Sequence, residues 1–439
     1  MYKLHERFMF FKEQKFLLII ALLLCSIYLP IFVSSILLFL WLIYFVFISK
    51  KNNFLFRYSL LALAVFFALM LLSFFWSINP NLTIKTLPKE FPFLLAFALF
   101  SFFTVSKNDV LKVLKTFSYF TVFVAAFFIL RGIIRSFLYN KISYMFFHGE
   151  YFNDYGLVPK SLNAVHISVF CSLAFIYFLQ NSNKSHFKYF SLVILGVFLW
   201  LLSSTVIIVS TIILTIVYFL YFSKTSNKLR LRNIILFIGI ILLFFSYNKL
   251  IRYISYEVKH NTNKGIGHNV IKENNILNNK ITWYDAWNKP VFTPQDYFPG
   301  TAFRIYQARV FKELVVENNT FWLGFGFNAS QIKVEEKSKS LNVFLGNEYH
   351  EGYQKKNFHN QYIQTFAELG FIGFLLLITI LFINTRNAFL SKDFLHISFA
   401  ILMISLFLTE SFLWRQRGVI FFTILYSLFN VSLPKKHQQ

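Results

Sequence analysis

Long runs of apolar residues recur along most of the chain and predict helices that cross a membrane. Runs of about 18 or more apolar residues have the length that an α-helix needs to span a bilayer. They do not alternate apolar and polar residues, as the strands of a membrane barrel would. Because a bare backbone crosses lipid only as a helix or a closed barrel, the pattern predicts an all-α polytopic membrane protein.

We expect about twelve transmembrane helices. The first apolar run contains no small-residue cleavage pattern before the second begins, so we expect a retained span there and not a signal peptide. The expected spans cover approximately residues 16–30, 31–49, 58–76, 91–106, 114–138, 161–180, 189–203, 205–222, 233–247, 360–384, 394–412 and 418–433.

A long polar segment divides these spans into two groups. Residues 1–247 contain the first nine, residues 248–357 form a large loop, and residues 358–439 contain the last three. Lys and Arg concentrate in the segments that lie inside when the N-terminus is inside, as cytoplasmic segments do. We therefore expect both termini in the cytoplasm and the large loop outside, in the periplasm or extracellular space.

The large loop shows no obvious hydrophobic core in its sequence. Residues 257–280 are rich in Asn and Lys and are expected to be irregular, whereas residues 330–357 are polar and highly charged and are expected to be mobile. After a Pro-Gly break, Thr301 can cap a helix that extends to about Asn318. Residues at helical spacing form its apolar face: Phe303, Tyr306, Val310 and Leu314.

Several loop residues are candidates for binding. Trp283 and Trp287 could stack on sugar rings, or they could lie at the membrane interface, where Trp and Tyr concentrate. Arg304 and Arg309 are five residues apart, roughly 140° around a helix, and do not share a face.

Glycines follow the expected loop helix. Gly324 and Gly326 permit a tight turn or a close backbone approach. They do not follow a strand in a βαβ unit, so a dinucleotide site is rejected.

The boundary between the loop and the next span carries unusual polar residues. His359 is expected at the membrane surface, while Asn360, Gln364 and Glu368 fall at i, i+4 and i+8 on one helical stripe. Glu368 would lie about 13 Å deeper than His359. An ionisable side chain at that depth marks a functional or a paired site. Glu368 could instead pair with a basic residue of a neighbouring helix, and His359 could be an interfacial histidine without a task.

The expected topology brings distant polar residues to the outer face. They are Arg131 and Arg135, at i and i+4 on one helix, His166, His359 and the turn from Glu410 to Arg417.

Composition and residue spacing argue against three kinds of partner or site. The net charge of +24 would favour nucleic acid in a soluble protein, but here cytoplasmic loops explain it, so no nucleic-acid partner is expected. Cys25 and Cys171 both lie inside apolar runs, which argues against a disulfide framework or a zinc site. No Asp/His cluster has metal-ligand spacing, and we expect neither a metal nor another cofactor.

Two adjacent motifs resemble a known family. Residues 358–364 read Phe-His-Asn-Gln-Tyr-Ile-Gln, and residues 367–373 read Ala-Glu-Leu-Gly-Phe-Ile-Gly. This string resembles the signature of the O-antigen ligase and O-antigen polymerase superfamily. Arg304 with Asn318 and the later Gly-Phe-Gly, and Trp-Ser-Ile-Asn-Pro at residues 76–80, also look similar to that family's pattern.

The chain departs from the family pattern at three places. Ala308 stands where an aromatic residue is often found, and residues 319–322 lengthen the turn where the family has a Pro. Residues 203–205 read Ser-Ser-Thr without the frequent Arg, so a phosphate contact could come from elsewhere.

The resemblance implies a GT-C-like membrane glycosyltransferase in the bacterial inner membrane. Its donor would be an undecaprenyl diphosphate-linked glycan, and its acceptor a lipid- or glycan-linked sugar such as lipid A-core, among membrane lipids. His359 and Arg304 would be catalytic. An arginine fork suits the leaving diphosphate, and a histidine suits the acceptor proton. The expected substrate-binding residues are Arg131, Arg135, Arg309, Asn360, Gln364, Glu368, Gly324, Gly326, Trp283 and Trp287.

Three alternatives remain open. A repeat-unit polymerase of the same superfamily would use the same donor. A polysaccharide transporter or flippase would show repeated halves with broken helices, and the sequence shows no repeat. A structural membrane protein would leave Glu368 and His359 unexplained.

Overall fold

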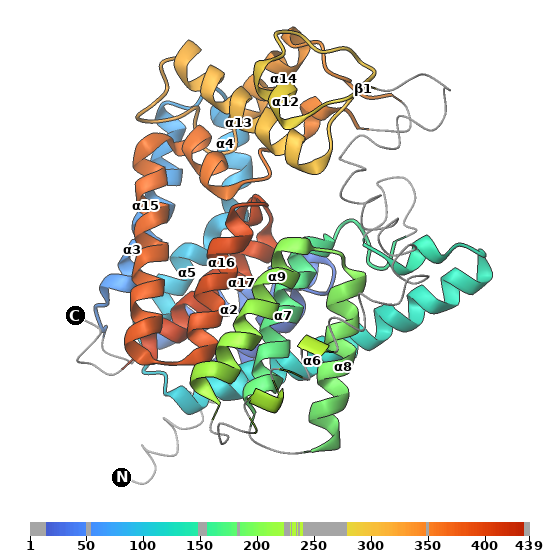
Figure 1. Ribbon diagram of the computed structural model, residues 1–439. Helices are drawn as coiled ribbons and strands as arrows, with labels where there is room; N and C mark the ends of the chain where they lie inside the picture. The colour runs from blue at the N-terminus through green and yellow to red at the C-terminus, as the bar shows by residue number, and fades with distance from the viewer. Residues whose placement is uncertain are drawn as a thin grey trace.

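The computed structural model describes most of the chain: residues 15–49, 54–147, 156–181, 185–223, 279–347 and 351–433, with a few positions between 229 and 239. Within these residues the protein is almost entirely helical. A bundle of apolar helices carries a smaller helical unit at one end (Figure 1).

The first part of the bundle begins with a hairpin. After the helix Lys15–Ser26, the amino-terminal elements are α2 (Ile31–Ser49), α3 (Tyr58–Leu72), α4 (Pro80–Thr86), α5 (Phe91–Phe100) and α6 (Lys107–Leu138). They are followed by α7 (Ala164–Gln180), α8 (His186–Leu201) and α9 (Thr205–Val217). The last three helices of the chain are α15 (Gln361–Ser391), α16 (Phe394–Phe407) and α17 (Gln416–Val431).

The expected spans coincide with these helices, apart from residues 233–247, which lie largely outside the described part of the chain. Among the described residues, four helices are long and apolar enough to cross a membrane, and five shorter helices are apolar. The protein is therefore a multi-pass membrane protein.

Helix α17 is the centre of the bundle. Every residue from Arg417 to Val431 is buried, and the helix packs against α3, α5, α15 and α16. Peripheral helices instead expose large apolar side chains, among them Phe39 of α2 and Phe123 of α6. An apolar exterior of this kind suits lipid, because the polar backbone groups are satisfied within each helix.

Between α9 and α15 lies a second, smaller unit, called here the loop unit (residues 279–347 and 351–357). It contains β1 (Asn279–Lys280), α12 (Trp283–Asn288), β2 (Asp296–Tyr297), α13 (Gly300–Glu317) and α14 (Ser330–Ser340). The two short strands pair in parallel. Helix α13 forms where we expected a helix from Thr301 to Asn318, and the four apolar residues of its expected face are buried. The expectation that Thr301 caps it is wrong, because the helix already begins at Gly300 after Pro299 and has no side-chain cap.

The expectation that this segment lacks a core is wrong. Phe298, Phe303, Tyr306 and Tyr353 pack ring against ring, with centroids 4.9–6.4 Å apart. Aromatic residues bury much area each, so these four rings contribute a large part of a small core.

Within residues 330–357, which we expected to be mobile, the structure contains helix α14. Helix α14 contributes one large apolar side chain to the core of the loop unit, that of Val334, which is fully buried. The hydroxyl groups of Ser338 and Tyr306 are 3.1 Å apart and attach the helix to α13. A helix with so few apolar positions has no periodic pattern for a sequence analysis to detect.

Helix α15 is broken at Gly370, where φ is 65° and ψ is −167°. The carbonyls of Ala367 and Glu368 accept hydrogen bonds from the backbone N–H groups of Phe325 and Gly326, both at 2.9 Å. Beyond the break, Phe371 N–H donates to the Phe321 carbonyl at 2.8 Å. The segment after α13 thus supplies the partners that a continuous helix would have supplied itself.

The same segment also contacts the end of α3. Ile78 N–H donates to the Phe325 carbonyl at 3.0 Å, and Trp76 Nε1 donates to the Leu323 carbonyl at 2.8 Å. Residues 76–80, the Gly-Phe-Gly turn and the break in α15 therefore meet at one place. These three motifs were separate in the sequence and form one structural joint.

Glycines make this joint possible. A Cβ atom on Gly324 would lie 2.6 Å from the Glu368 backbone, and one on Gly326 would lie 2.4 Å from the Ser77 side chain. Both glycines also have positive φ angles. We expected Gly324 and Gly326 to bind substrate, but the structure places them in backbone-to-backbone packing.

Candidate active site

His359 lies at the junction of the loop unit and α15. Its φ of 46° is left-handed, and its backbone N–H donates to Asn357 Oδ1 at 3.0 Å. The next residue, Asn360, caps α15, since its Oδ1 accepts the Ile363 N–H at 3.0 Å. This turn holds the imidazole just outside the first turn of the helix, at the boundary where the sequence placed it.

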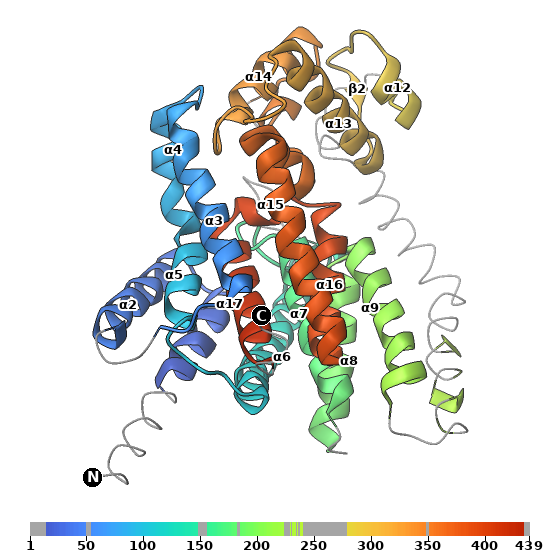
Figure 2. The ribbon, with the colours of Figure 1, turned by 90° about the vertical axis from the view of Figure 1, so that its left-hand side faces the viewer.

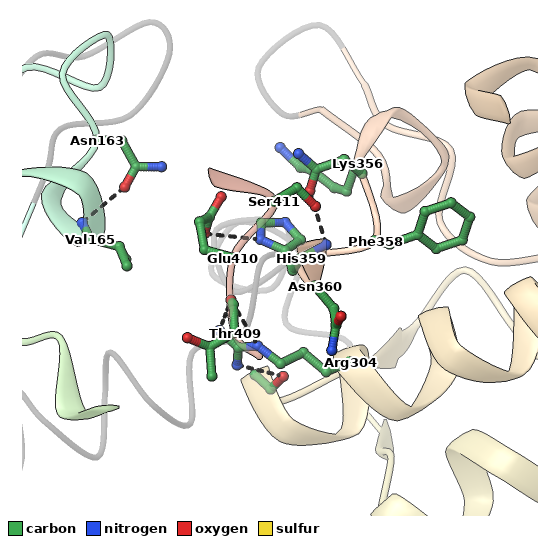
Figure 3. Close-up of polar contacts among 12 residues, drawn as sticks. Asn163, Val165, Arg304, Lys356, Phe358, His359, Asn360, Thr409, Glu410 and Ser411 are labelled. Atoms are coloured by element: carbon green, nitrogen blue, oxygen red, sulfur yellow. Dashed lines mark hydrogen bonds and ion pairs between the residues drawn. The ribbon is translucent and has the colours of Figure 1, made fainter. Parts of the chain in front are cut away.

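Glu410 faces His359 from the connection between α16 and α17. His359 Nδ1 lies 3.4 Å from Glu410 Oε2, and the carboxylate is buried (Figure 3). Burial alone would raise the pKa of Glu410, but the charge and hydrogen bond of His359, with the charges of His166 and Arg415, outweigh it and lower the pKa to about 2. Glu410 is therefore an anion that fixes and stabilises the imidazole.

Arg304 reaches the same turn from α13. Its Nε and Nη2 atoms both donate to the Thr409 carbonyl, at 3.3 and 3.1 Å, and its Nη1 donates to the Gly300 carbonyl at 3.1 Å. Burial lowers the pKa of Arg304 and the Glu410 carboxylate opposes that effect, so the guanidinium stays charged at neutral pH. The two expected catalytic residues are thus held by adjacent residues, Thr409 and Glu410 (Figure 3).

Glu410 was not among the expected site residues, although the turn that contains it was expected on the same face. It lies near the end of an apolar run, 51 residues from His359. The signal that could have identified it is its position, because a carboxylate at the end of a membrane helix requires a partner.

The expected polar stripe of α15 has structural partners. Asn360 Nδ2 donates to the Leu408 carbonyl at 3.1 Å. Gln364 Nε2 donates to Glu368 Oε1 at 2.6 Å, and Gln364 Oε1 accepts the Phe358 N–H at 3.3 Å. Gln364 and Glu368 are buried, so they support the turn that carries His359.

Glu368 also lines a small internal cavity. Lys89, Glu90, Gln361 and Trp414 share this cavity, which has room for about one water molecule. Lys89 Nζ donates to the Trp414 carbonyl at 3.2 Å. Lys89, a basic residue of a neighbouring segment, therefore lines the same cavity as Glu368. This arrangement favours the interpretation that Glu368 has a basic partner within the bundle.

Three expected arginines lie elsewhere. Arg309 points into the loop unit, where its Nε donates to Glu313 at 2.7 Å. Arg131 donates to the Leu157 carbonyl at 3.2 Å, and Arg135 lies one turn further along α6. Figure 1 shows the end of α6 extending away from α13, the helix that carries Arg304.

The aromatic residues of α12 are on the surface of the loop unit. Trp283 is 67% exposed and Trp287 is 40% exposed. Lys312 Nζ lies 5.3 Å from the centre of the Trp287 ring. This surface is accessible, but α12 contributes no side chain to the contacts that join His359, Arg304 and Glu410.

Together these features define a multi-pass helical membrane protein with a histidine, an arginine and a carboxylate gathered where a loop unit meets the bundle. Residues 189–378 match the family model for O-antigen ligase. Members of this family are membrane glycosyltransferases of the ligase or polymerase type. The matched segment includes Arg304 and His359 and ends before Glu410. Among curated proteins the comparison finds no match.

Proposed function

We propose that this protein is an O-antigen ligase-like glycosyltransferase. It moves a glycan from undecaprenyl diphosphate to an acceptor sugar, such as that of lipid A-core, on the outer face of the bacterial inner membrane. The observation that carries the proposal is the turn Thr409–Glu410, which contacts both Arg304 and His359. A general base and a phosphate-binding cation are the two groups that this reaction needs side by side.

In the proposed reaction the acceptor hydroxyl attacks the anomeric carbon of the glycan. The bond from that carbon to the diphosphate oxygen breaks, and its electron pair leaves with the lipid diphosphate. His359 takes the proton of the hydroxyl through Nε2, because Nδ1 faces Glu410. Attack from the side opposite the diphosphate inverts the anomeric centre.

Glu410 and Arg304 stabilise the charges that develop in this reaction. The imidazolium formed on His359 lies beside the Glu410 carboxylate, which is ionised at neutral pH. Arg304 presents a planar fork that matches two phosphate oxygens, and its position is preset by the bonds to the Thr409 and Gly300 carbonyls.

The proposal includes a topology. Residues 1–247 and 358–439 form a GT-C-like bundle of twelve transmembrane helices with both termini in the cytoplasm, and residues 248–357 lie outside. This topology is supported by the position of the loop unit, which lies at one end of the bundle of apolar helices (Figure 2). Cysteines introduced in α14 and near Lys392 are labelled in whole cells with a reagent that does not cross the membrane. This tests whether α14 lies outside and the connection at Lys392 lies in the cytoplasm.

The central experiment is transfer in vitro by the purified protein in detergent, with a lipid diphosphate-linked glycan as donor. Wild type is compared with His359→Ala and Arg304→Ala, with and without EDTA, and Lys333→Ala on the exposed face of α14 serves as the control. We expect transfer by wild type and the control and loss of transfer in both site variants, with folding unchanged. Full activity in both site variants would show that the site is wrong. No transfer by wild type would favour the transporter alternative.

A deletion strain separates ligase from polymerase. Loss of a ligase leaves lipid-linked polymer that is not joined to lipid A-core. Loss of a polymerase leaves lipopolysaccharide capped with single repeat units. A gel of the lipopolysaccharide distinguishes these outcomes, and we expect the first.

A further inference from the structure

A second group of cations includes Lys356, which lies three residues before His359 in the sequence. Figure 3 shows Lys356 above the imidazole and Arg304 below it. Lys356 Nζ lies 2.6 Å from Glu351 Oε2, and Lys160 Nζ lies 3.5 Å from the same oxygen. Two lysines from distant segments therefore converge on a single carboxylate oxygen.

Arg415 is the third member of this group. Its Nη1 atom donates to the carbonyls of Lys160 and Ser161, both at 3.5 Å. Burial lowers the pKa of Lys160, and the positive charges of Lys356 and Arg415 lower it further, whereas Glu351 opposes them. Lys160 thus lies close enough to Lys356 and to Arg415 for their charges to oppose its own.

These cations come from three different connections. Lys160 precedes α7, Lys356 precedes α15 and Arg415 precedes α17. The side chains of Lys160 and Glu351 are each 30% exposed, and that of Lys356 is 17% exposed. Partly buried like charges are costly to hold together unless an anion compensates them. The fold therefore maintains a site whose chemistry favours an anion, and Glu351 is the carboxylate that both lysines contact.

A phosphate group suits this site better than one carboxylate does. Phosphate carries more charge and more acceptor oxygens, and lysines bind it as compact point charges. Glu351 contacts both lysines through the same oxygen, Oε2. A phosphate could give each of the three cations an oxygen of its own.

We propose that Lys160, Lys356 and Arg415 form an anion subsite for a phosphate group of a lipid diphosphate, and that Glu351 occupies this subsite until the ligand displaces it. The inference rests on the proposed function for the identity of the ligand. Glu351 then acts as an internal competitor of the donor.

The test is calorimetric titration of the full-length protein in detergent with two probes, farnesyl diphosphate and inorganic diphosphate. We expect Lys160→Gln and Lys356→Gln each to weaken binding of farnesyl diphosphate by about tenfold, since each removes a charge-assisted hydrogen bond. We expect Glu351→Gln to tighten binding by about threefold to tenfold, because more of the protein is competent to bind. The ion pair Lys333–Glu336 on α14, whose side chains are 29% and 58% exposed, provides the control variants Lys333→Gln and Glu336→Gln, which should leave binding unchanged.

The direction of the Glu351→Gln effect is decisive, because a misfolded variant could not bind more tightly. Unchanged or weaker binding in this variant, or wild-type binding in both lysine variants, overturns the proposal. If the protein binds inorganic diphosphate but not farnesyl diphosphate, the assignment to a lipid headgroup is overturned. Transfer is measured on the same samples. Wild type without transfer but with the expected binding pattern would reject the glycosyltransferase function and retain the anion subsite.

Discussion

His359 Nδ1 lies 3.4 Å from Glu410 Oε2, although 51 residues separate the two positions. The contact joins the start of α15 to the connection that follows α16. It fixes which imidazole nitrogen faces the protein and which can face a substrate. The histidine at the loop boundary is thereby placed in a defined chemical environment.

Glu410→Gln should lower kcat for transfer by about tenfold to hundredfold, because the amide cannot stabilise the imidazolium that forms on His359. KM for the donor should change little, since Glu410 does not contact the diphosphate in the proposed reaction. Steady-state transfer kinetics of purified protein check this. Glu313→Gln, which removes a carboxylate in the loop unit, is the control and should leave kcat unchanged. A rise in KM alone would contradict the role assigned to Glu410.

Glu410 should also make stability depend on pH. Its pKa in the folded protein is about 2, lowered from 4.5 chiefly by His359 against the opposing effect of burial. A carboxyl group with a depressed pKa stabilises the folded state above about pH 4.5, and this contribution is lost as the pH falls towards 2. The difference in free energy of unfolding between wild type and Glu410→Gln should therefore shrink between these values. Thermal unfolding of wild type and Glu410→Gln is measured at pH 7 and pH 3. The same difference in stability between the two proteins at both pH values would contradict this prediction.

Gly370→Ala should destabilise the protein by about 3 kcal/mol or more. The residue has a φ of 65°, and an added Cβ would lie 2.2 Å from the Trp322 backbone. Gly196→Ala in α8 is the matched control, because its Cβ would meet nothing closer than 3.9 Å and alanine favours a helix. Thermal unfolding in detergent compares the two. Equal melting temperatures would show that the break in α15 tolerates a side chain.

Arg309→Ala should reduce stability by about 1–3 kcal/mol and leave the kinetics unchanged. Its guanidinium pairs with Glu313 at 2.7 Å inside the loop unit, which favours a structural role over the expected role at the diphosphate. Melting temperature and KM for the donor are measured on the same protein. A raised KM with an unchanged melting temperature would instead show that Arg309 contributes to substrate binding.

Much of the architecture could be predicted because it depends on short stretches of sequence. Apolar runs identified the helices of the bundle, and the Pro-Gly break and apolar periodicity identified α13, since local length and periodicity are what membrane crossing and helix formation require. The motif around His359 and the position of Arg304 identified two residues that the structure brings to one turn.

Other features could not be predicted because they depend on distant residues. The core of the loop unit joins the aromatic rings of residues 298–306 to Tyr353, which lies much later in the sequence, and α14 has little apolar periodicity of its own. The break in α15 is stable only because Phe325 and Gly326 satisfy the carbonyls of Ala367 and Glu368.

By itself, the sequence determined that this protein is a multi-pass helical membrane protein with a polar junction before α15. Hydrophobic length and local spacing suffice for that, because they act within single elements. Only the tertiary structure decided which charged groups meet. Glu410 lies beside His359, Lys356 and Lys160 contact Glu351, and Arg309 pairs with Glu313 inside the loop unit. Electrostatic partners are chosen by distance in space, and that distance exists only after the helices have packed.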